Sequence, residues 1–166
     1  MILAEKQEAR VAALDKLFPH QRKDFVGIFE AMGARPVTIR FLDPPLHEFL
    51  PHTEEDCVDV AKATGLDAKA LLARSKDLAE SNPMLGFRGC RLAIVFPEIY
   101  DMQARAVFEA ACDVAEKGAA PIPEIMIPFV ITKKELETLR ARVDAIAAEV
   151  FAKRGKAIEY LVGTMI

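Results

Sequence analysis

Two arginines stand where a ligand site is expected in a parallel α/β fold. Arg40 lies in the apolar stretch "VTIRFL", which has the β-branched residues of a strand over Val37–Leu42, and Arg88 follows a second short predicted strand, Pro83–Phe87. Ligands of such folds bind at the carboxyl ends of the strands. Because a guanidinium group offers a planar fork of donors and stays charged, two arginines at that edge favour a phosphate or carboxylate ligand.

The same two arginines have a structural interpretation. Arg40 lies three residues before Asp43, which can pair with it, and Arg88 can pair with a carboxylate on a helix. Residue types and spacing therefore leave an anion-binding site and a pair of structural ion pairs both open.

The histidines fit no catalytic motif. His20 is expected to be solvated at a helix break, and His47 and His52 are expected to hold a loop by hydrogen bonds. No sequence motif pairs them with the serine, cysteine or carboxylate that a catalytic histidine would need. The sequence also has no P-loop, no G-x-G-x-x-G and no H-E-x-x-H motif.

Composition narrows the class of protein. The 166 residues are 52% hydrophobic and 28% charged, which is ordinary for one globular domain. The net charge of −3 and the pI near 5.7 give no electrostatic case for a nucleic-acid or anionic-membrane partner. No apolar run has the length of a membrane span, and "MILAEKQEAR" becomes charged too early for a signal-peptide core.

The three cysteines predict neither a disulfide framework nor a zinc site, because they are odd in number and far apart: Cys57, Cys90 and Cys112. A reducing cytoplasm is the expected compartment. Cys90, between a glycine and an arginine, could have a lowered thiol pKa, but a small buried residue is the commoner role for an unpaired cysteine.

Helices and strands are predicted to alternate along the chain. Apolar periodicity predicts a helix over residues 5–32, broken near Pro19. Further helices are expected over 53–64, 67–79, 91–116 and 132–155, and further strands over 121–130 and 157–166. This order predicts a parallel sheet with right-handed crossovers. Four strands are too few for a complete (β/α)8 barrel, so a single partial domain over 1–166 is expected.

Four segments carry a family resemblance: "VTIRFLDPPLHEFLP", "NPMLGFRGCRLAIVFPEIYDMQARAVFEAA", "PEIMIPFV" and "VGTMI". In this order they resemble the pyruvate, phosphate dikinase family of phosphoenolpyruvate-utilising enzymes, in the C-terminal TIM barrel that binds phosphoenolpyruvate and pyruvate. Phosphoenolpyruvate synthase and the first enzyme of the sugar phosphotransferase system share the R-x-x-D and N-P-x-L-G-x-R cores. The segment "DPPLHEFLP" is typical of the dikinases alone.

The resemblance implies a transferase that converts ATP, phosphate and pyruvate to AMP, pyrophosphate and phosphoenolpyruvate. A nucleotide domain would phosphorylate a histidine on a swivelling domain, which would pass the phosphoryl group to pyruvate enolate at the barrel. Arg40 and Arg88 match the family's contacts to the transferring phosphoryl group. Asp43 is expected to orient Arg40, and Asn82 or Gly86 to shape the loop.

The resemblance also implies magnesium in the parent enzyme, with a glutamate ligand directly after Ile166. We therefore expect this chain alone to bind no metal, to lack dikinase activity without the nucleotide and phosphohistidine domains, and to self-associate through open strand edges. Two alternatives stay open. One is a relative with another phosphoryl donor, and the other is a non-catalytic α/β interaction domain. For plant relatives, a plastid is the alternative to the cytoplasm.

Overall fold

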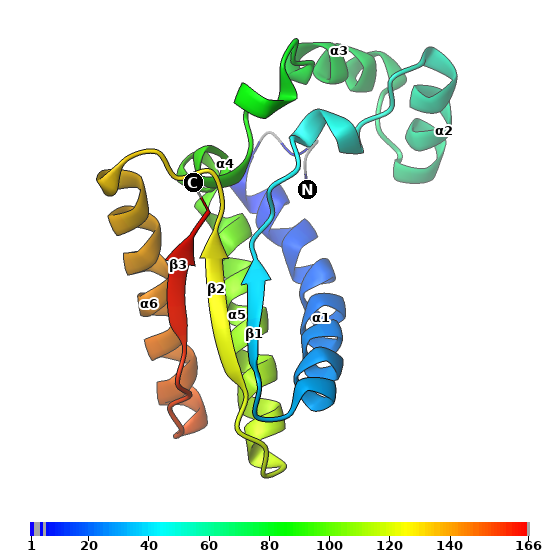
Figure 1. Ribbon diagram of the computed structural model, residues 1–166. Coiled ribbons are helices and arrows are strands. Elements are labelled where there is room, and N and C mark those ends of the chain that lie inside the picture. Colours follow the sequence, from blue (N-terminus) through cyan, green and yellow to red (C-terminus); the bar gives the residue numbers. More distant parts are fainter. Residues whose placement is uncertain (2–3, 5, 166) are drawn as a thin grey trace.

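A three-stranded parallel sheet forms the centre of the computed structural model, which describes residues 1, 4 and 6–165 (Figure 1). The strands are β1 (Pro36–Arg40), β2 (Ile122–Ile127) and β3 (Leu161–Thr164), in the order β1-β2-β3. The α-helices are α1 (Gln7–Met32), α2 (Glu54–Thr64), α3 (Ala68–Leu78), α4 (Gly89–Val95), α5 (Pro97–Glu116) and α6 (Lys133–Arg154). Two 3-10 helices, η1 (Leu46–Phe49) and η2 (Pro83–Leu85), complete the described elements. The predicted parallel α/β class is confirmed.

Helices α1, α5 and α6 cover one face of the sheet, with α5 in the middle (Figure 1). Ile39, Ile125 and Ile127 are buried on that face. Many buried side chains of α5 are alanines, and its buried Phe108 packs edge-on against Phe151 and Tyr160. Buried apolar surface of this kind is the main source of stability in such a layer.

In the part of the chain that the structure describes, no helix covers the opposite face of the sheet (Figure 1). The register places Thr38, Glu124 and Leu161 in one row across the strands. The next row, nearer the carboxyl ends, contains Arg40, Met126 and Gly163. In a barrel, side chains on such a face form layers of the interior. Arg40 is therefore on the uncovered face, in the row closest to the carboxyl ends of the strands. This end of the sheet would form the mouth of a barrel and is called the mouth below.

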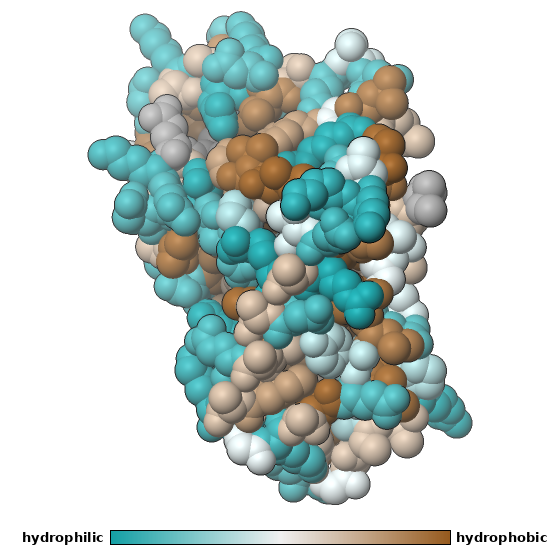
Figure 2. All heavy atoms as spheres, turned by 90° about the vertical axis from the view of Figure 1, so that its left-hand side faces the viewer, coloured by the Kyte–Doolittle hydropathy of each residue, from teal (hydrophilic) through white to brown (hydrophobic). Residues whose placement is uncertain are grey.

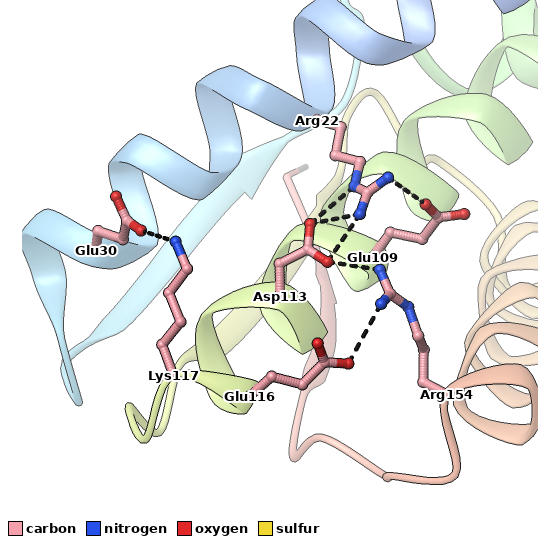
Figure 3. A network of polar contacts seen from close by, with 7 residues as sticks. All are labelled: Arg22, Glu30, Glu109, Asp113, Glu116, Lys117 and Arg154. Carbon is pink, nitrogen blue, oxygen red and sulfur yellow. Dashed lines mark hydrogen bonds and ion pairs between the residues drawn. The ribbon is translucent and has the colours of Figure 1, made fainter.

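An ion-pair network ties the helices together at the amino-terminal end of the sheet (Figure 3). Asp113 of α5 accepts two hydrogen bonds from Arg22 of α1, at 2.7 and 2.9 Å, and one from Arg154 at the end of α6, at 2.5 Å. Arg22 and Arg154 each reach a second carboxylate on α5, those of Glu109 and Glu116. One shared carboxylate thus fixes three helices at the end of the sheet remote from the mouth.

Three predictions about elements were wrong. Residues 83–87 form no strand: η2 is a single 3-10 turn, so the described part of the chain has three strands and not four. Helix α1 runs unbroken through Pro19. The last strand begins only at Leu161, and its predicted end at Ile166 lies outside the described residues.

Helices α2 and α3 form a hairpin beyond the carboxyl ends of the strands, apart from the helical layer (Figure 1). Thr53 caps α2 by accepting a hydrogen bond from the Asp56 amide, and Gly65 ends the helix in a left-handed conformation. The helices predicted over 53–64 and 67–79 are thus confirmed. No helix in the described part of the chain is long and apolar enough to cross a membrane.

The surface over α6 mixes hydrophilic with weakly hydrophobic side chains (Figure 2). Hydrophobic side chains interrupt it chiefly in the upper half of the view, at the height of α4. Exposed apolar residues of α4 and of the loop after β2 include Ile94, Val95 and Ile131. The apolar exposure is therefore greater near the carboxyl ends of the strands than along α6.

Candidate functional site

One buried carboxylate holds both candidate arginines. Nη1 of Arg40 lies 3.1 Å from Oδ2 of Asp43, and Nη2 of Arg88 donates to the same oxygen at 2.8 Å. Nε of Arg88 also donates to the Asp43 backbone carbonyl at 3.0 Å. The structure thus brings together residues that are 45 positions apart in the sequence.

The two arginines differ in how far they reach solvent. The Asp43 side chain is 1% exposed and that of Arg88 16%, whereas the Arg40 side chain is 49% exposed. Both guanidinium groups contact the same oxygen of one carboxylate. The half-exposed guanidinium group of Arg40, on the uncovered face of the sheet, suits a bound anion.

The ion-pair interpretation was correct for one partner and wrong for the other. Arg40 pairs with Asp43, as its spacing indicated. Among the described residues, the carboxylate that Arg88 contacts is that of Asp43 as well, and not one on a helix. The arrangement is therefore a shared cluster at the carboxyl end of β1 rather than two separate pairs.

Gly89 allows the close packing that buries Asp43. Its φ is +57°, and a Cβ atom here would lie 2.7 Å from Cβ of Phe129 and 3.1 Å from Oδ1 of Asp43. The next residue, Cys90, donates its amide to the Pro128 carbonyl at 3.0 Å. Only glycine fits this point without a shift of backbone or carboxylate. The start of α4 is therefore locked onto the loop after β2.

Phe129 follows the carboxyl end of β2 and contacts Arg88 and Arg91. It is a non-glycine residue with a positive φ of 64°, a conformation that costs free energy and is often found at functional sites. Its ring lies 4.9 Å from the guanidinium carbon of Arg88 and 5.1 Å from that of Arg91. Such cation–π contacts fix the position of the guanidinium group. No sequence signal indicated this role for Phe129.

Asn82 and Gly86 belong to the loop that leads to Arg88. Oδ1 of Asn82 accepts the Met84 amide at 3.1 Å, and Nη1 of Arg91 donates to the carbonyls of Leu85 and Gly86. The loop borders a hollow of about 550 Å³, lined by Ala79, Glu80, Ser81, Asn82, Leu85, Gly86, Phe87 and Arg91. These contacts set the path of the chain into Arg88.

The three cysteines are free and buried. Sγ of Cys90 lies 2.9 Å from the Phe129 carbonyl, to which it can donate. Burial raises the pKa of the Cys90 thiol, and it also raises that of Cys112. A raised pKa disfavours the nucleophilic thiolate, so packing is the role that the surroundings of these two thiols support.

The surroundings of the three histidines do not indicate a catalytic base beside the arginine cluster. His20 is exposed on α1. The ring centroids of His47 and His52 lie 6.5 Å apart, edge to face. Nδ1 of His47 is buried without a hydrogen-bond partner, so the expectation that His47 holds the loop by hydrogen bonds was wrong at this atom.

Magnesium binding requires several oxygen ligands in one place. Among the described residues, no group of three or more histidine, cysteine, aspartate or glutamate side chains is placed to hold a metal ion. Asp43 is already committed to two arginines. The described residues therefore do not fit a magnesium site.

The fold and the cluster define a parallel α/β domain with two arginines joined by one buried carboxylate at the carboxyl end of β1. The family model for the PEP-binding domain of PEP-utilising enzymes, where PEP is phosphoenolpyruvate, matches residues 1–166. The chain belongs to this family, as the quoted motifs indicated.

Curated relatives agree with this family. The chain is 55% identical over 167 residues to pyruvate, phosphate dikinase of Rhizobium meliloti and 51% identical over 166 residues to that of Giardia intestinalis. It is 52% identical over 168 residues to the chloroplastic pyruvate, phosphate dikinase 1 of Arabidopsis thaliana. Each match covers all of this chain but only 19%, 19% and 17% of the relative. The chain therefore spans less than a fifth of the length of these relatives.

Proposed function

We propose that this chain is the central part of the barrel that binds phosphoenolpyruvate and pyruvate in a pyruvate, phosphate dikinase, and that Arg40 and Arg88 hold the phosphoryl group during its transfer. The observation that carries the proposal is the shared Asp43 cluster at the carboxyl end of β1. The complete reaction would convert ATP, phosphate and pyruvate to AMP, pyrophosphate and phosphoenolpyruvate. Family membership supports the substrate class.

The proposed chemistry relies on fixed positive charge. A transferring phosphoryl group passes through a loose transition state, in which negative charge spreads over its oxygens. Guanidinium groups that are already in place stabilise that charge without reorganisation. Asp43 and the Phe129 ring hold Arg88 at defined contacts, and Asp43 also restrains the more exposed Arg40.

The phosphoryl donor would lie on another part of the parent chain. We propose a phosphohistidine on a mobile domain as donor, with magnesium as cofactor of the parent enzyme and the cytoplasm, or a plastid in plants, as its compartment. The 166-residue chain alone would then be inactive. Arg40 is half-exposed on the uncovered face of the sheet, a position that is compatible with a phosphoryl donor that approaches from the mouth.

The ion pairs are also compatible with the alternative of a non-catalytic interaction domain, because a purely structural cluster would contain the same contacts. The two interpretations differ in what happens when the charge is removed. A structural cluster would lose stability, whereas a phosphoryl-binding cluster would lose turnover.

The test is the rate of phosphoenolpyruvate formation by full-length Arg40→Ala and Arg88→Ala variants. We expect each to lower kcat about a hundredfold, as for the loss of other groups that stabilise transition-state charge. The matched control is Arg140→Ala, because Arg140 is exposed on α6 and pairs only loosely with Asp144 at 3.7 Å. Wild-type turnover in Arg40→Ala would favour the non-catalytic interaction domain. Turnover with another phosphoryl donor, but none with ATP and phosphate, would indicate one of the related enzymes.

A further inference from the structure

The peptide groups of Leu42 lie between Arg40 and Asp43 and are held by two side chains of α5. The Leu42 amide donates to Oε1 of Gln103 at 2.9 Å. The hydroxyl group of Tyr100 donates to the Leu42 carbonyl at 2.8 Å. Both backbone groups of one residue are thus bonded to side chains rather than to a neighbouring strand.

This contact begins where the sheet ends. The Phe41 amide still bonds to the Met126 carbonyl of β2, at 3.1 Å. One residue later the chain leaves the ladder for the Asp43-Pro44-Pro45 turn, in which the prolines have no amide to donate. Tyr100 and Gln103 supply the hydrogen bonds that the sheet no longer provides.

The two side chains are built into the core and are not a surface contact. Tyr100 is 3% exposed and Gln103 is 7% exposed. They lie three residues apart on α5, which places them on the same face of the helix. The Tyr100 ring also packs edge-on against Phe41, with centroids 4.9 Å apart. A buried amide such as that of Gln103 is costly unless it is bonded, so its position opposite Leu42 is strongly constrained.

We infer that Tyr100 and Gln103 are positioning residues, which clamp Leu42 so that Arg40 and Asp43 keep the geometry that phosphoryl transfer requires. This inference rests on the proposed function. Asp43 is bonded to both arginines, so a shift of the Leu42 peptide would move Asp43 and with it the contacts of Arg40 and Arg88. Burial raises the pKa of Tyr100, which keeps its hydroxyl group neutral and able to donate.

The test compares two removals of a tyrosine hydroxyl group in the full-length protein. Tyr100→Phe deletes the bond to Leu42. Tyr160→Phe is the matched control, because the Tyr160 hydroxyl donates to Oδ1 of Asp144 at the same distance of 2.8 Å, and its ring packs on Phe108, eight residues beyond Tyr100 on α5. Gln103→Met is a second variant, which removes the acceptor for the Leu42 amide and keeps an unbranched side chain.

We expect Tyr100→Phe and Gln103→Met to lower kcat for phosphoenolpyruvate formation about tenfold or more, as for other small displacements of a site. The KM for pyruvate should change less than kcat, and the KM for ATP should stay unchanged. Tyr160→Phe should keep the wild-type kcat. Hydrogen exchange of the Leu42 amide should be faster in Gln103→Met.

Two results would overturn the inference. One is a wild-type kcat in both clamp variants. The other is an equal loss of kcat in Tyr100→Phe and Tyr160→Phe that is accompanied by an equal fall in their melting temperatures. That result would show a merely structural role for the Tyr100 hydroxyl group. A wild-type protein that forms no phosphoenolpyruvate would instead overturn the proposed function. In that case unchanged Leu42 exchange in Gln103→Met would still reject the clamp.

Discussion

Asp43 controls the electrostatics of the candidate site, because its single carboxylate contacts both guanidinium groups. A buried carboxylate without partners would be unfavourable by several kcal/mol, and the two arginines remove that cost. Their shared acceptor also means that neither arginine can move far without affecting the other. The geometry of the site therefore depends more on Asp43 than on either cation.

At the residue scale, we predict that Asp43→Asn damages the site without removing an arginine. Asparagine has similar size but no charge, so both cations lose their common ionic partner. In the full-length protein, kcat for phosphoenolpyruvate formation should fall on the order of a hundredfold, as expected for misplacement of a reacting site. Asp144→Asn is the control, since Asp144 lies on α6 and accepts a hydrogen bond from the Tyr160 hydroxyl group. Equal rates for Asp43→Asn and the wild type would refute the role of Asp43.

Residue patterns could predict only part of this cluster. Arg40 and Asp43 are three positions apart, so their pairing follows from local spacing. The contact between Arg88 and Asp43 depends on how the chain returns after 45 residues, which no local pattern specifies. The positive φ of Phe129 is equally hidden, because nothing in its residue type favours that conformation.

At the scale of the element, helix α6 begins with a reciprocal capping box. Oγ1 of Thr132 accepts the Glu135 amide, and Oε2 of Glu135 accepts the amides of Thr132 and Ile131, at 2.8 and 2.9 Å. These backbone hydrogen bonds, that from Thr132 first, lower the pKa of Glu135. The start of α6 follows the loop that contains Phe129, so the cap also fixes the end of that loop.

The lowered pKa of Glu135 predicts a pH dependence of stability. A carboxyl group with a lower pKa in the folded state stabilises the fold above its unfolded pKa, and this contribution is lost as pH falls through the folded pKa. Glu135→Gln should therefore lower the urea midpoint of the chain at pH 7, with a smaller difference from the wild type below about pH 4, near the ordinary pKa of glutamate. Glu137→Gln, on the exposed side of the same turn, is the control. A difference that is the same at both pH values would contradict the prediction.

The errors in element prediction have physical causes. Pro19 removes one backbone hydrogen bond and normally breaks a helix, but α1 packs along α5, where Arg105 also covers the Phe18 ring at 4.2 Å. Tertiary packing thus maintains the helix. In the 83–87 segment, Arg91 donates to the carbonyls of Leu85 and Gly86, and the Glu80 side chain accepts the Phe87 amide, so side chains bond the backbone groups that a strand would pair in a sheet. In contrast, α6 and its capping box were predictable from the local sequence.

At the scale of the whole molecule, the helices among the described residues cover one face of the sheet, and β1 and β3 are its two edge strands. The uncovered rows mix polar and apolar side chains, among them Thr38, Met126 and Leu161. A parallel sheet is normally covered on both faces, and strand edges offer unpaired backbone groups to another chain. The arrangement is that expected of part of a barrel.

We therefore predict that the isolated 166-residue chain self-associates. Sedimentation velocity at micromolar concentration should show species larger than a monomer, because association covers the exposed face and edges. Replacing Leu161 by lysine on the uncovered face should shift the distribution toward monomer, whereas the same change at exposed Leu17 of α1 should not. A monodisperse monomer of the unmodified chain would contradict this prediction.

The affinity of the full-length protein for phosphoenolpyruvate, measured by calorimetry, tests the central claim most directly. Hydrogen bonds to charged groups contribute about 1.5–3 kcal/mol each, so the account predicts that Arg40→Ala and Arg88→Ala each bind phosphoenolpyruvate roughly ten- to a hundredfold more weakly. The Arg140→Ala control should bind as tightly as the wild type. Unchanged phosphoenolpyruvate affinity in both site variants would contradict the assignment of the Asp43 cluster as the phosphoryl-binding site.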